Sequence, residues 1–276
     1  MEKIAFIGAG SVVEAMITGV LSKGHIHPDQ IWLTNQSNRE RLKKLHEAFG
    51  VHTTYDKQLI VQEAEMIILC MKPKDITEAL HTIRPFVQPN QLIVSVLAGV
   101  SSEYICDQLD LKIPVVRAMP NTSAAIGYSA TAIASSKHAT AEHLQAVKQL
   151  FETIGTVVTV DEKDLHAITA LSGSGPAYIY YFVEAMEQAA TELDLQAPLA
   201  KELIIQTLTG AAEMLKVSVD TPSMLRRNIT SPGGTTQAGI ETLETYDFQE
   251  AVIAAIKNAT ERSITLGSPY QTKVKK

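Results

Sequence analysis

The chain has 276 residues, enough for two domains and a sizeable buried core. Apolar residues make up 45% and charged residues 20% of it, which excludes collagen-like, disordered and coiled-coil classes. With 24 Lys and Arg against 30 Asp and Glu, the formal net charge is -6, so we expect no nucleic-acid partner.

Cysteine and histidine usage narrows the class further. Two cysteines, Cys70 and Cys106, are too few for a disulfide framework and fit a reducing cytoplasm, where we expect the protein to act. The eight histidines show no metal-ligand spacing, so we expect no metal site. Polar residues, Gly and Pro interrupt the longest uncharged stretches, which therefore lack the roughly 20 apolar residues of a membrane helix. We expect no membrane partner.

The first half alternates short apolar runs with segments of helical periodicity. The runs predicted as strands are Ile4 to Ile7, Ile31 to Thr34, Met66 to Met71, Leu92 to Leu97, and Val115 to Met119. They lack strict alternation, which is typical of strands buried on both faces of a parallel sheet. A last strand pair, Ala130 to Ala134 and Thr156 to Val160, brackets a helix near Glu142 to Phe151. The pattern predicts an α/β fold whose first domain is a Rossmann-type doubly wound sheet.

After about Lys163 the periodicity becomes helical and stays so. One of several apolar stripes consists of Leu199, Leu203, Ile204, Leu208, Ala211 and Leu215. We therefore expect a domain of residues 1–163 that binds the cofactor and an all-helical domain of residues 164–276. The second is too small to cover all its apolar faces, which favours burial against another copy of the chain. We expect a homo-oligomer, at least a dimer.

A glycine-rich turn follows the first predicted strand and opens the first helix. It reads Gly8-Ala9-Gly10-Ser11-Val12-Val13. The first glycine suits a tight turn, and the second lets a pyrophosphate approach the N–H groups at a helix N-terminus. A plain strand-to-helix turn is the alternative. The cofactor-binding residues expected here are Ile7, Gly8, Ala9, Gly10, Ser11 and Val12.

The end of the second predicted strand indicates which dinucleotide binds. An acidic residue there would hold the ribose diol of NAD, but Thr34-Asn35-Gln36-Ser37-Asn38-Arg39 contains none. Hydrogen-bond donors and a guanidinium suit a 2′-phosphate, so Asn35, Ser37 and Arg39 favour NADPH, with NADH possible. The same residues can instead cap the next helix.

Further candidates follow other strands, at the edge where open α/β sheets bind ligands. Cys70-Met71-Lys72-Pro73 ends one strand, and Arg117-Ala118-Met119-Pro120-Asn121-Thr122 ends another. Lys72 suits either a cofactor contact or a solvated surface, and Asn121 suits either the nicotinamide amide or a turn.

Two glycine clusters occur in the helical half. Ser172-Gly173-Ser174-Gly175-Pro176 is predicted to break a helix, and Ser231-Pro232-Gly233-Gly234-Thr235-Thr236 to precede one. Each is compatible with an ordinary loop. Glycines before a helix N-terminus also expose N–H donors to an anion, and the threonines add hydroxyl donors.

Taken together, the sequence resembles the pyrroline-5-carboxylate reductase family from Ile4 to about Gly267. The most specific match runs from Leu225 to Gly239 and includes Ser231-Pro232-Gly233-Gly234-Thr235-Thr236. Met71-Lys72-Pro73, Ala98-Gly99-Val100, the Arg117 to Thr122 run and the Leu171 to Pro176 run also match in order and spacing. The resemblance implies a Rossmann domain followed by a helical domain that dimerises.

The resemblance also implies a reaction and its residues. Family members transfer hydride from a reduced nicotinamide to the C=N carbon of 1-pyrroline-5-carboxylate, which gives proline. Thr236 would donate to the ring nitrogen as the catalytic residue, and Gly233, Gly234 and Thr235 would bind the carboxylate with help from Ser174. Met71, Lys72, Pro73, Ala98 and Asn121 would join the cofactor site. An acidic residue among Asp161, Glu162 and Asp164 would contact the substrate.

Two other functions fit parts of the sequence. A β-hydroxyacid-type dehydrogenase needs a lysine on the helix after Gly175, and none occurs before Lys201. An inactive nucleotide-binding paralogue is suggested by Val13, Gln36 and Met71, where family members often carry other residues, but the intact Gly233-Gly234-Thr235-Thr236 run argues against it.

Overall fold

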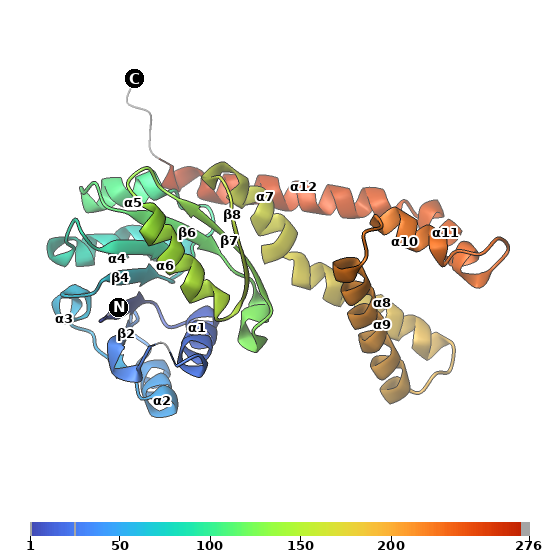
Figure 1. Ribbon diagram of the computed structural model, residues 1–276, viewed down its shortest axis with the longest axis horizontal. Coiled ribbons are helices and arrows are strands. Elements are labelled where there is room, and N and C mark those ends of the chain that lie inside the picture. Colours follow the sequence, from blue (N-terminus) through green and yellow to red (C-terminus); the bar gives the residue numbers. More distant parts are fainter. Residues whose placement is uncertain (1, 25, 272–276) are drawn as a thin grey trace, which may run out of the picture. The chain divides into compact units, whose positions relative to one another are not determined.

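The computed structural model describes residues 2–24 and 26–271, so the last residues of the expected second domain lie outside the described residues. The chain forms two compact units, Met1–Pro176 with Lys257–Lys276, and Ala177–Ile256 (Figure 1). The first unit thus extends past the boundary expected at residue 163 and includes the end of the last helix. None of the described helices is long and apolar enough to cross a membrane.

The first unit contains a sheet that has eight strands in its described residues. They are β1 (Ile4–Ile7), β2 (Ile31–Thr34), β3 (His52–Thr53), β4 (Met66–Leu69), β5 (Leu92–Ser95), β6 (Val115–Met119), β7 (Ser129–Ser135) and β8 (Gly155–Thr159). Their order is β3-β2-β1-β4-β5-β6-β7-β8, and every pair is parallel except β6 with β7. Order 3-2-1-4-5-6 is that of the Rossmann fold, so the predicted fold class is confirmed.

Helices of the first unit cover both faces of this sheet. They are α1 (Ser11–Ser22), α2 (Arg39–Phe49), α3 (Lys57–Val61), α4 (Ile76–Ile83), α5 (Ser102–Leu109), α6 (Ala141–Glu152) and α7 (Leu165–Ile168). One core joins the sheet to α1, α2 and α6 through residues such as Ile17, Leu45 and Phe151. A second core joins the opposite face to α3, α4 and α5 through Ile60, Leu80 and Ile105. Burial on both faces explains the unbroken apolar runs of the strands.

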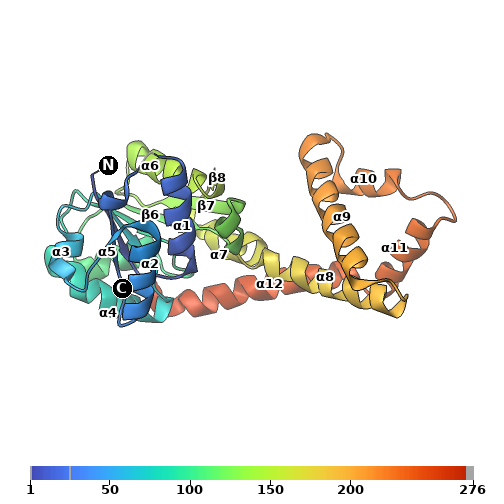
Figure 2. The same ribbon diagram turned by 90° about the horizontal axis from the view of Figure 1, so that it is seen from below.

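The second unit is helical, as expected. The helices beyond α7 are α8 (Gly175–Glu192), α9 (Ala197–Val217), α10 (Pro222–Asn228), α11 (Thr235–Thr245) and α12 (Phe248–Gly267), of which α8 and α12 each run into both units (Figure 2). Only Ala200 and Ile204 are buried on α9, although it is 21 residues long. Leu199, Leu203 and Ile205 are each about half exposed, at 48%, 55% and 51%.

The break predicted at Ser172 to Pro176 takes the form of a π-helical turn and a one-residue bend at Ser174. Thr169–Gly173 forms a π-helical turn, and Ser174 keeps a right-handed helical conformation before α8 begins at Gly175. The N–H of Ser174 donates to the carbonyl of Thr169 at 2.8 Å. The small residues widen one helical turn here instead of forming an open loop.

Candidate active site

The turn after β1 has the geometry that a dinucleotide requires. Gly8 has a φ of +125°, and a Cβ there would lie 2.5 Å from the carbonyl oxygen of Cys70, so only glycine fits. Gly10 caps the N-terminus of α1, and a Cβ built on it meets no described atom within 4 Å. The backbone beside Gly10 is therefore open to an approaching phosphate group. Val13 lies fully buried in the core behind the turn.

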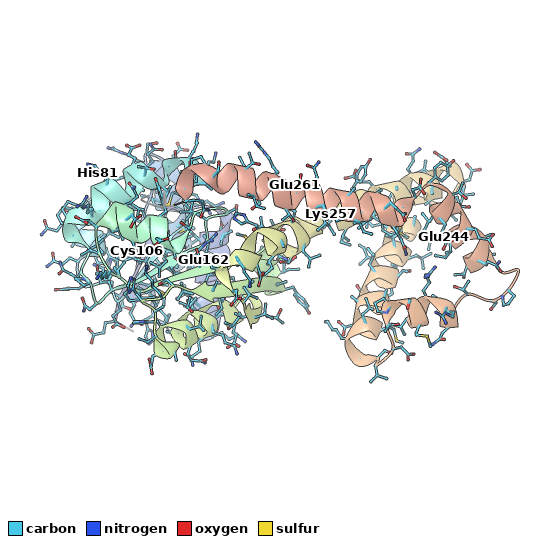
Figure 3. The ribbon with its side chains drawn as sticks, turned by 90° about the horizontal axis from the view of Figure 1, so that it is seen from above. His81, Cys106, Glu162, Glu244, Lys257 and Glu261 are labelled. Atoms are coloured by element: carbon cyan, nitrogen blue, oxygen red, sulfur yellow. The ribbon has the colours of Figure 1, made fainter. Side chains whose placement is uncertain are left out.

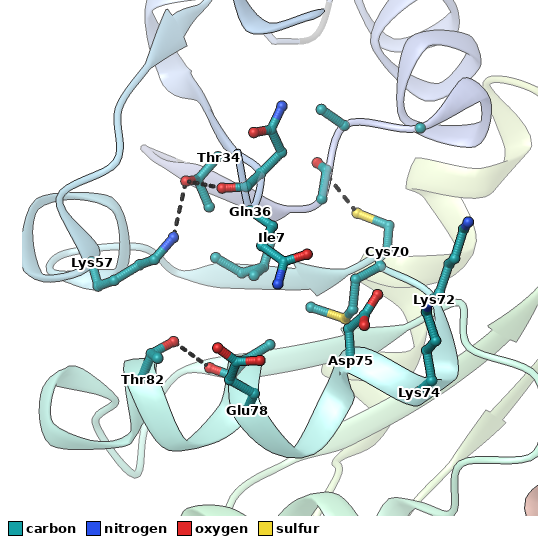
Figure 4. A pocket seen from close by; sticks show the side chains of 16 residues that line it. Ile7, Thr34, Gln36, Lys57, Cys70, Lys72, Lys74, Asp75, Glu78 and Thr82 are labelled. Atoms are coloured by element: carbon teal, nitrogen blue, oxygen red, sulfur yellow. Dashed lines mark hydrogen bonds between the residues drawn. The ribbon is translucent and has the colours of Figure 1, made fainter. Parts of the chain in front are cut away.

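This turn borders a cleft of about 590 Å³ at the carboxyl ends of β1, β2 and β4. Seven of the residues predicted to bind the cofactor line it: Ile7, Gly8, Ala9, Gly10, Asn35, Met71 and Lys72. The cleft lies where the strand order reverses between β1 and β4, the place where open α/β sheets bind ligands. Much of the remaining lining consists of residues that were not predicted as cofactor ligands: Thr34, Gln36, Lys57, Cys70, Lys74, Asp75 and Glu78 (Figure 4).

The three residues predicted to bind a 2′-phosphate differ in their position relative to the cleft. Asn35 lines the cleft, while its amide donates to the carbonyl of Asn38 at 2.7 Å. Ser37 and Arg39 are exposed and outside the cleft lining, with Arg39 as the first residue of α2. Each remains a candidate contact for a phosphate that projects beyond the lining.

Lys57, the first residue of α3, places a positive charge in the cleft near the carboxyl end of β2. Its ammonium donates to the hydroxyl of Thr34 at 3.1 Å (Figure 4). Partial burial lowers the pKa of Lys57. The sequence signal for Lys57 is weak, because β3, which places it beside the end of β2, is only two residues long. Asp56 before it caps α3 by accepting from the N–H of Leu59 at 3.0 Å.

A second missed residue, Arg41 of α2, holds the glycine turn. Its Nε donates to the carbonyl of Ala9 at 2.8 Å, and its terminal nitrogen lies 2.7 Å from a carboxylate oxygen of Glu14. These contacts fix the turn against α1 and α2. Arg41 therefore supports the backbone of this candidate phosphate-binding turn.

The other predicted residues on the sheet edge lie near the cleft without lining it. Ser11 and Val12 begin α1, Pro73 begins a 3-10 turn, and Ala98 follows β5, where it packs against a small cluster around Met119. Cys70 does line the cleft, and burial raises the pKa of its thiol, so it stays protonated at neutral pH.

Asn121 links the sheet edge to the start of the helical region. Its side-chain amide donates to the carbonyl of Ser172 at 3.1 Å, and its amide oxygen accepts from the N–H of Ser123 at 3.2 Å. Ser174 follows on the same π-helical turn and is half-buried. The structure thus ties two predicted site residues, Asn121 and Ser174, to one turn.

The second glycine cluster lies in the helical unit and ends at the N-terminus of α11, as predicted. Gly233 has a φ of +69°, while Gly234 caps the helix with a φ of -86°. The N–H of Gly233 donates to Oε1 of Gln237 at 2.7 Å, and that of Gly234 donates to the carbonyl of Ser231 at 3.0 Å. Within the described residues, the N–H and hydroxyl groups of Thr235 and Thr236 have no hydrogen-bond partner. These four donors are available to an anion.

The three acidic candidates near the start of the helical region differ in environment. Asp161 is 74% exposed and lies 3.2 Å from the ammonium of Lys163. Asp164 is exposed, whereas Glu162 is 27% exposed and contacts both Arg117 and Ser102. Among residues 2–24 and 26–271, no three or more His, Cys, Asp or Glu side chains gather as metal ligands do.

Comparison with known proteins identifies the family. The sequence is 47% identical over 270 residues to pyrroline-5-carboxylate reductase 2 of Bacillus subtilis, covering 98% of this chain and 97% of the relative. The chain belongs to the pyrroline-5-carboxylate reductase family. Residues 162–266 match the family model for pyrroline-5-carboxylate reductase dimerisation, and residues 3–99 match the model described as NADP oxidoreductase, coenzyme F420-dependent.

Solved structures of pyrroline-5-carboxylate reductases share the fold over nearly the whole chain. The enzyme from Coxiella burnetii is 32% identical with a TM-score of 0.87, covering 96% of this chain and 98% of the other. The Plasmodium falciparum enzyme, solved with NADP bound, is 27% identical with a TM-score of 0.87, covering 97% and 99%. The family resemblance inferred from the motifs is confirmed.

Proposed function

We propose that this protein reduces 1-pyrroline-5-carboxylate to L-proline with NADPH, as the last step of proline biosynthesis. Family membership across nearly the whole chain carries the proposal. The cleft beside Gly8 and Gly10 fits a dinucleotide. Gly8 allows the tight turn against Cys70 that a side chain would prevent, and Gly10 leaves the backbone open to a phosphate group. The nicotinamide cofactor supplies the hydride when bound.

The protein's own residues bind and polarise the substrate in this proposal. The substrate carboxylate accepts hydrogen bonds from the N–H groups that begin α11, where the helix dipole is positive. Of the expected cradle, Thr235 offers free donors, while Gly233 and Gly234 shape the backbone and use their own N–H groups internally. The N–H of Thr236, the next residue, is also free among the described residues. Ser174 is the further hydroxyl that the family resemblance assigns to this carboxylate.

Thr236 acts on the ring nitrogen. Its hydroxyl has no partner among the described residues, unlike that of Thr242 on the same helix, which donates to the carbonyl of Ala238 at 3.0 Å. A hydrogen bond to the ring nitrogen withdraws electron density from the C=N carbon and makes it a better hydride acceptor.

NADPH is proposed over NADH because no carboxylate follows directly on the end of β2. The stretch from Asn35 to Arg39 contains no acid, and Lys57 adds a positive charge inside the cleft. A 2′-phosphate is attracted by such donors, whereas a ribose diol prefers a carboxylate.

The activity is tested by incubating the purified chain with 1-pyrroline-5-carboxylate and NADPH. We expect proline to form in step with NADPH oxidation, with a higher kcat/KM for NADPH than for NADH. NADPH oxidation without proline, or no oxidation, would contradict the proposal.

We also propose that the chain self-associates through its helical unit. Leu203 of α9 is 55% exposed in a region rich in exposed apolar side chains, and such surfaces are normally covered. Light scattering should give at least a dimer for the full chain. Leu203→Arg should shift the measured mass toward that of a monomer, whereas Glu202→Arg, at the neighbouring exposed position, should leave the mass unchanged. A monomer for the unaltered chain at micromolar concentration would contradict the proposal.

A further inference from the structure

The loop that joins β5 to α5 lies beside the cofactor cleft. Ser95 at the end of β5 is paired with Leu69 at the end of β4, directly before the cleft residues Cys70 to Lys72. The phosphates bind near β1 in this fold, and the nicotinamide half extends over the strands beyond the switch point. The loop from Leu97 to Ser101 therefore borders the nicotinamide half of the proposed cofactor.

Glu162 holds the far end of this loop. One carboxylate oxygen accepts from the N–H of Ser102 at 2.8 Å, and the other accepts from the Ser102 hydroxyl at 2.5 Å. Ser102 is the first residue of α5, so the carboxylate caps that helix at its positive end. Glu162 lies three residues after the end of β8, where the chain leaves the sheet for the helical region (Figure 3).

Arg117 links Glu162 to the near end of the loop. It lies on β6 with an exposure of 3%, and one guanidinium nitrogen is 3.1 Å from the Glu162 oxygen that accepts from the Ser102 N–H. The other terminal nitrogen donates to the carbonyl of Leu97 at 3.5 Å. Its Nε has no partner among the described residues. Because a buried guanidinium is tolerated only with a counter-ion, Arg117 and Glu162 keep each other in place.

Two residues that follow α12, Tyr270 and Gln271, hold the middle of the same loop. Both the N–H and the hydroxyl of Ser101 donate to the carbonyl of Tyr270, at 3.2 and 3.0 Å. The amide of Gln271 donates to the carbonyl of Gly99 at 3.1 Å. Gly99 also packs so closely on Gly267 that a Cβ on it would lie 2.7 Å from the Gly267 Cα. The backbone between Leu97 and Ser102 is thus fixed by residues distant in sequence.

We propose that Glu162 is a positioning residue for the nicotinamide half of the cofactor, and that it acts through Arg117 and Ser102 rather than by touching the substrate. Its carboxylate oxygens are occupied by these two partners, whereas the exposed Asp161 carboxylate pairs, among the described residues, with Lys163. The inference rests on the proposed function only in that NADPH is the cofactor. Removing the contacts lets the loop shift, and the bound nicotinamide loses its place.

The test compares two ligands on the full-length protein by calorimetry. NADPH carries the nicotinamide, whereas 2′-phospho-ADP-ribose is the same molecule without it. Glu162→Gln should weaken NADPH binding at least about tenfold and leave binding of 2′-phospho-ADP-ribose within about twofold. Asp161→Asn, a matched carboxylate-to-amide change one residue away, should alter neither. Ser102→Ala keeps the Arg117 ion pair and should repeat the pattern more weakly, even if Glu162→Gln fails to fold.

Two outcomes would overturn the inference. Equal weakening of both ligands would show a general structural role, and unchanged NADPH binding in both folded variants would show no role. The assay uses no pyrroline substrate. An unaltered protein that binds NADPH but makes no proline would count against the proposed function and leave this test intact.

Discussion

The ammonium of Lys57 donates to the hydroxyl of Thr34 at 3.1 Å, at the carboxyl end of β2 and inside the cofactor cleft. Partial burial removes water from this ammonium and lowers its pKa. A negatively charged ligand bound beside the ammonium offsets that loss of solvation, so the ion pair adds to the ligand's affinity. This pair places a positive charge inside the cleft near the end of β2, where Arg39 was expected to bind a 2′-phosphate.

Lys57→Met should therefore reduce discrimination between the two cofactors. It keeps the aliphatic stem and removes the charge, so kcat/KM for NADPH should fall about tenfold or more while that for NADH changes little. Arg39→Ala should have a smaller effect on the ratio of kcat/KM for NADPH to kcat/KM for NADH, because Arg39 is exposed and does not line the cleft. If Arg39→Ala has the larger effect, the 2′-phosphate lies toward α2 and Lys57 is not its main partner.

Gly234→Ala tests the carboxylate site. Gly234 has a negative φ that alanine tolerates, but its Cβ would lie 3.1 Å from the carbonyl oxygen of Ser231 and displace the loop before Thr235. We expect KM for 1-pyrroline-5-carboxylate to rise at least about tenfold, with the Kd for NADPH unchanged. Gly239→Ala on the same helix, where a Cβ meets nothing within 4 Å, is the control. Weaker NADPH binding with an unchanged substrate KM would assign the loop to the cofactor instead.

Much of this fold was predictable because strands of a parallel sheet are buried on both faces. The ranges predicted for β1, β2 and β6 are those observed. The two residues of β3 are too few to show any periodicity, and the antiparallel direction of β7 leaves no trace in an apolar run. The form of the break near Ser174, a π-helical turn, could not be foreseen because glycine and serine are as typical of a loop as of a widened turn.

The candidate site likewise contains residues that the sequence could predict and residues that it could not. Gly8 and the loop before Thr235 could be predicted because a turn followed by a helix start is local in sequence. Lys57 and the Arg117–Glu162 pair could not, since their roles depend on which strands are neighbours, and the two members of that pair are 45 positions apart.

Thr236→Val tests the donor to the ring nitrogen. Valine keeps the shape of threonine and lacks the hydroxyl, so kcat should fall by about tenfold to a thousandfold while NADPH binding is retained. Thr242→Val is the matched control, because that hydroxyl donates to a helix carbonyl. Equal activity of the Thr236→Val protein would mean that the ring nitrogen receives its hydrogen bond from another group.

His166 should make stability depend on pH. Burial and the nearby Arg117 charge lower its pKa below the ordinary value of 6.5, so the unfolded chain binds the proton more readily than the folded one. Its contribution to stability is therefore complete above about pH 6.5 and declines as the pH falls toward the folded-state pKa. His166→Asn should make the free energy of unfolding decline less steeply between about pH 7 and about pH 5. Urea denaturation at several pH values in this range measures that free energy. Parallel curves for both proteins would refute this assignment.

The most direct test of the account follows the hydride itself. NADPH that carries deuterium on one or the other face of the nicotinamide ring is supplied with 1-pyrroline-5-carboxylate, and the proline formed is analysed by mass spectrometry. We predict that one of the two labelled cofactors delivers a single deuterium to the ring carbon that was double-bonded to nitrogen. Proline without label from either cofactor, or the absence of proline, would contradict the assignment of this chain as a pyrroline-5-carboxylate reductase.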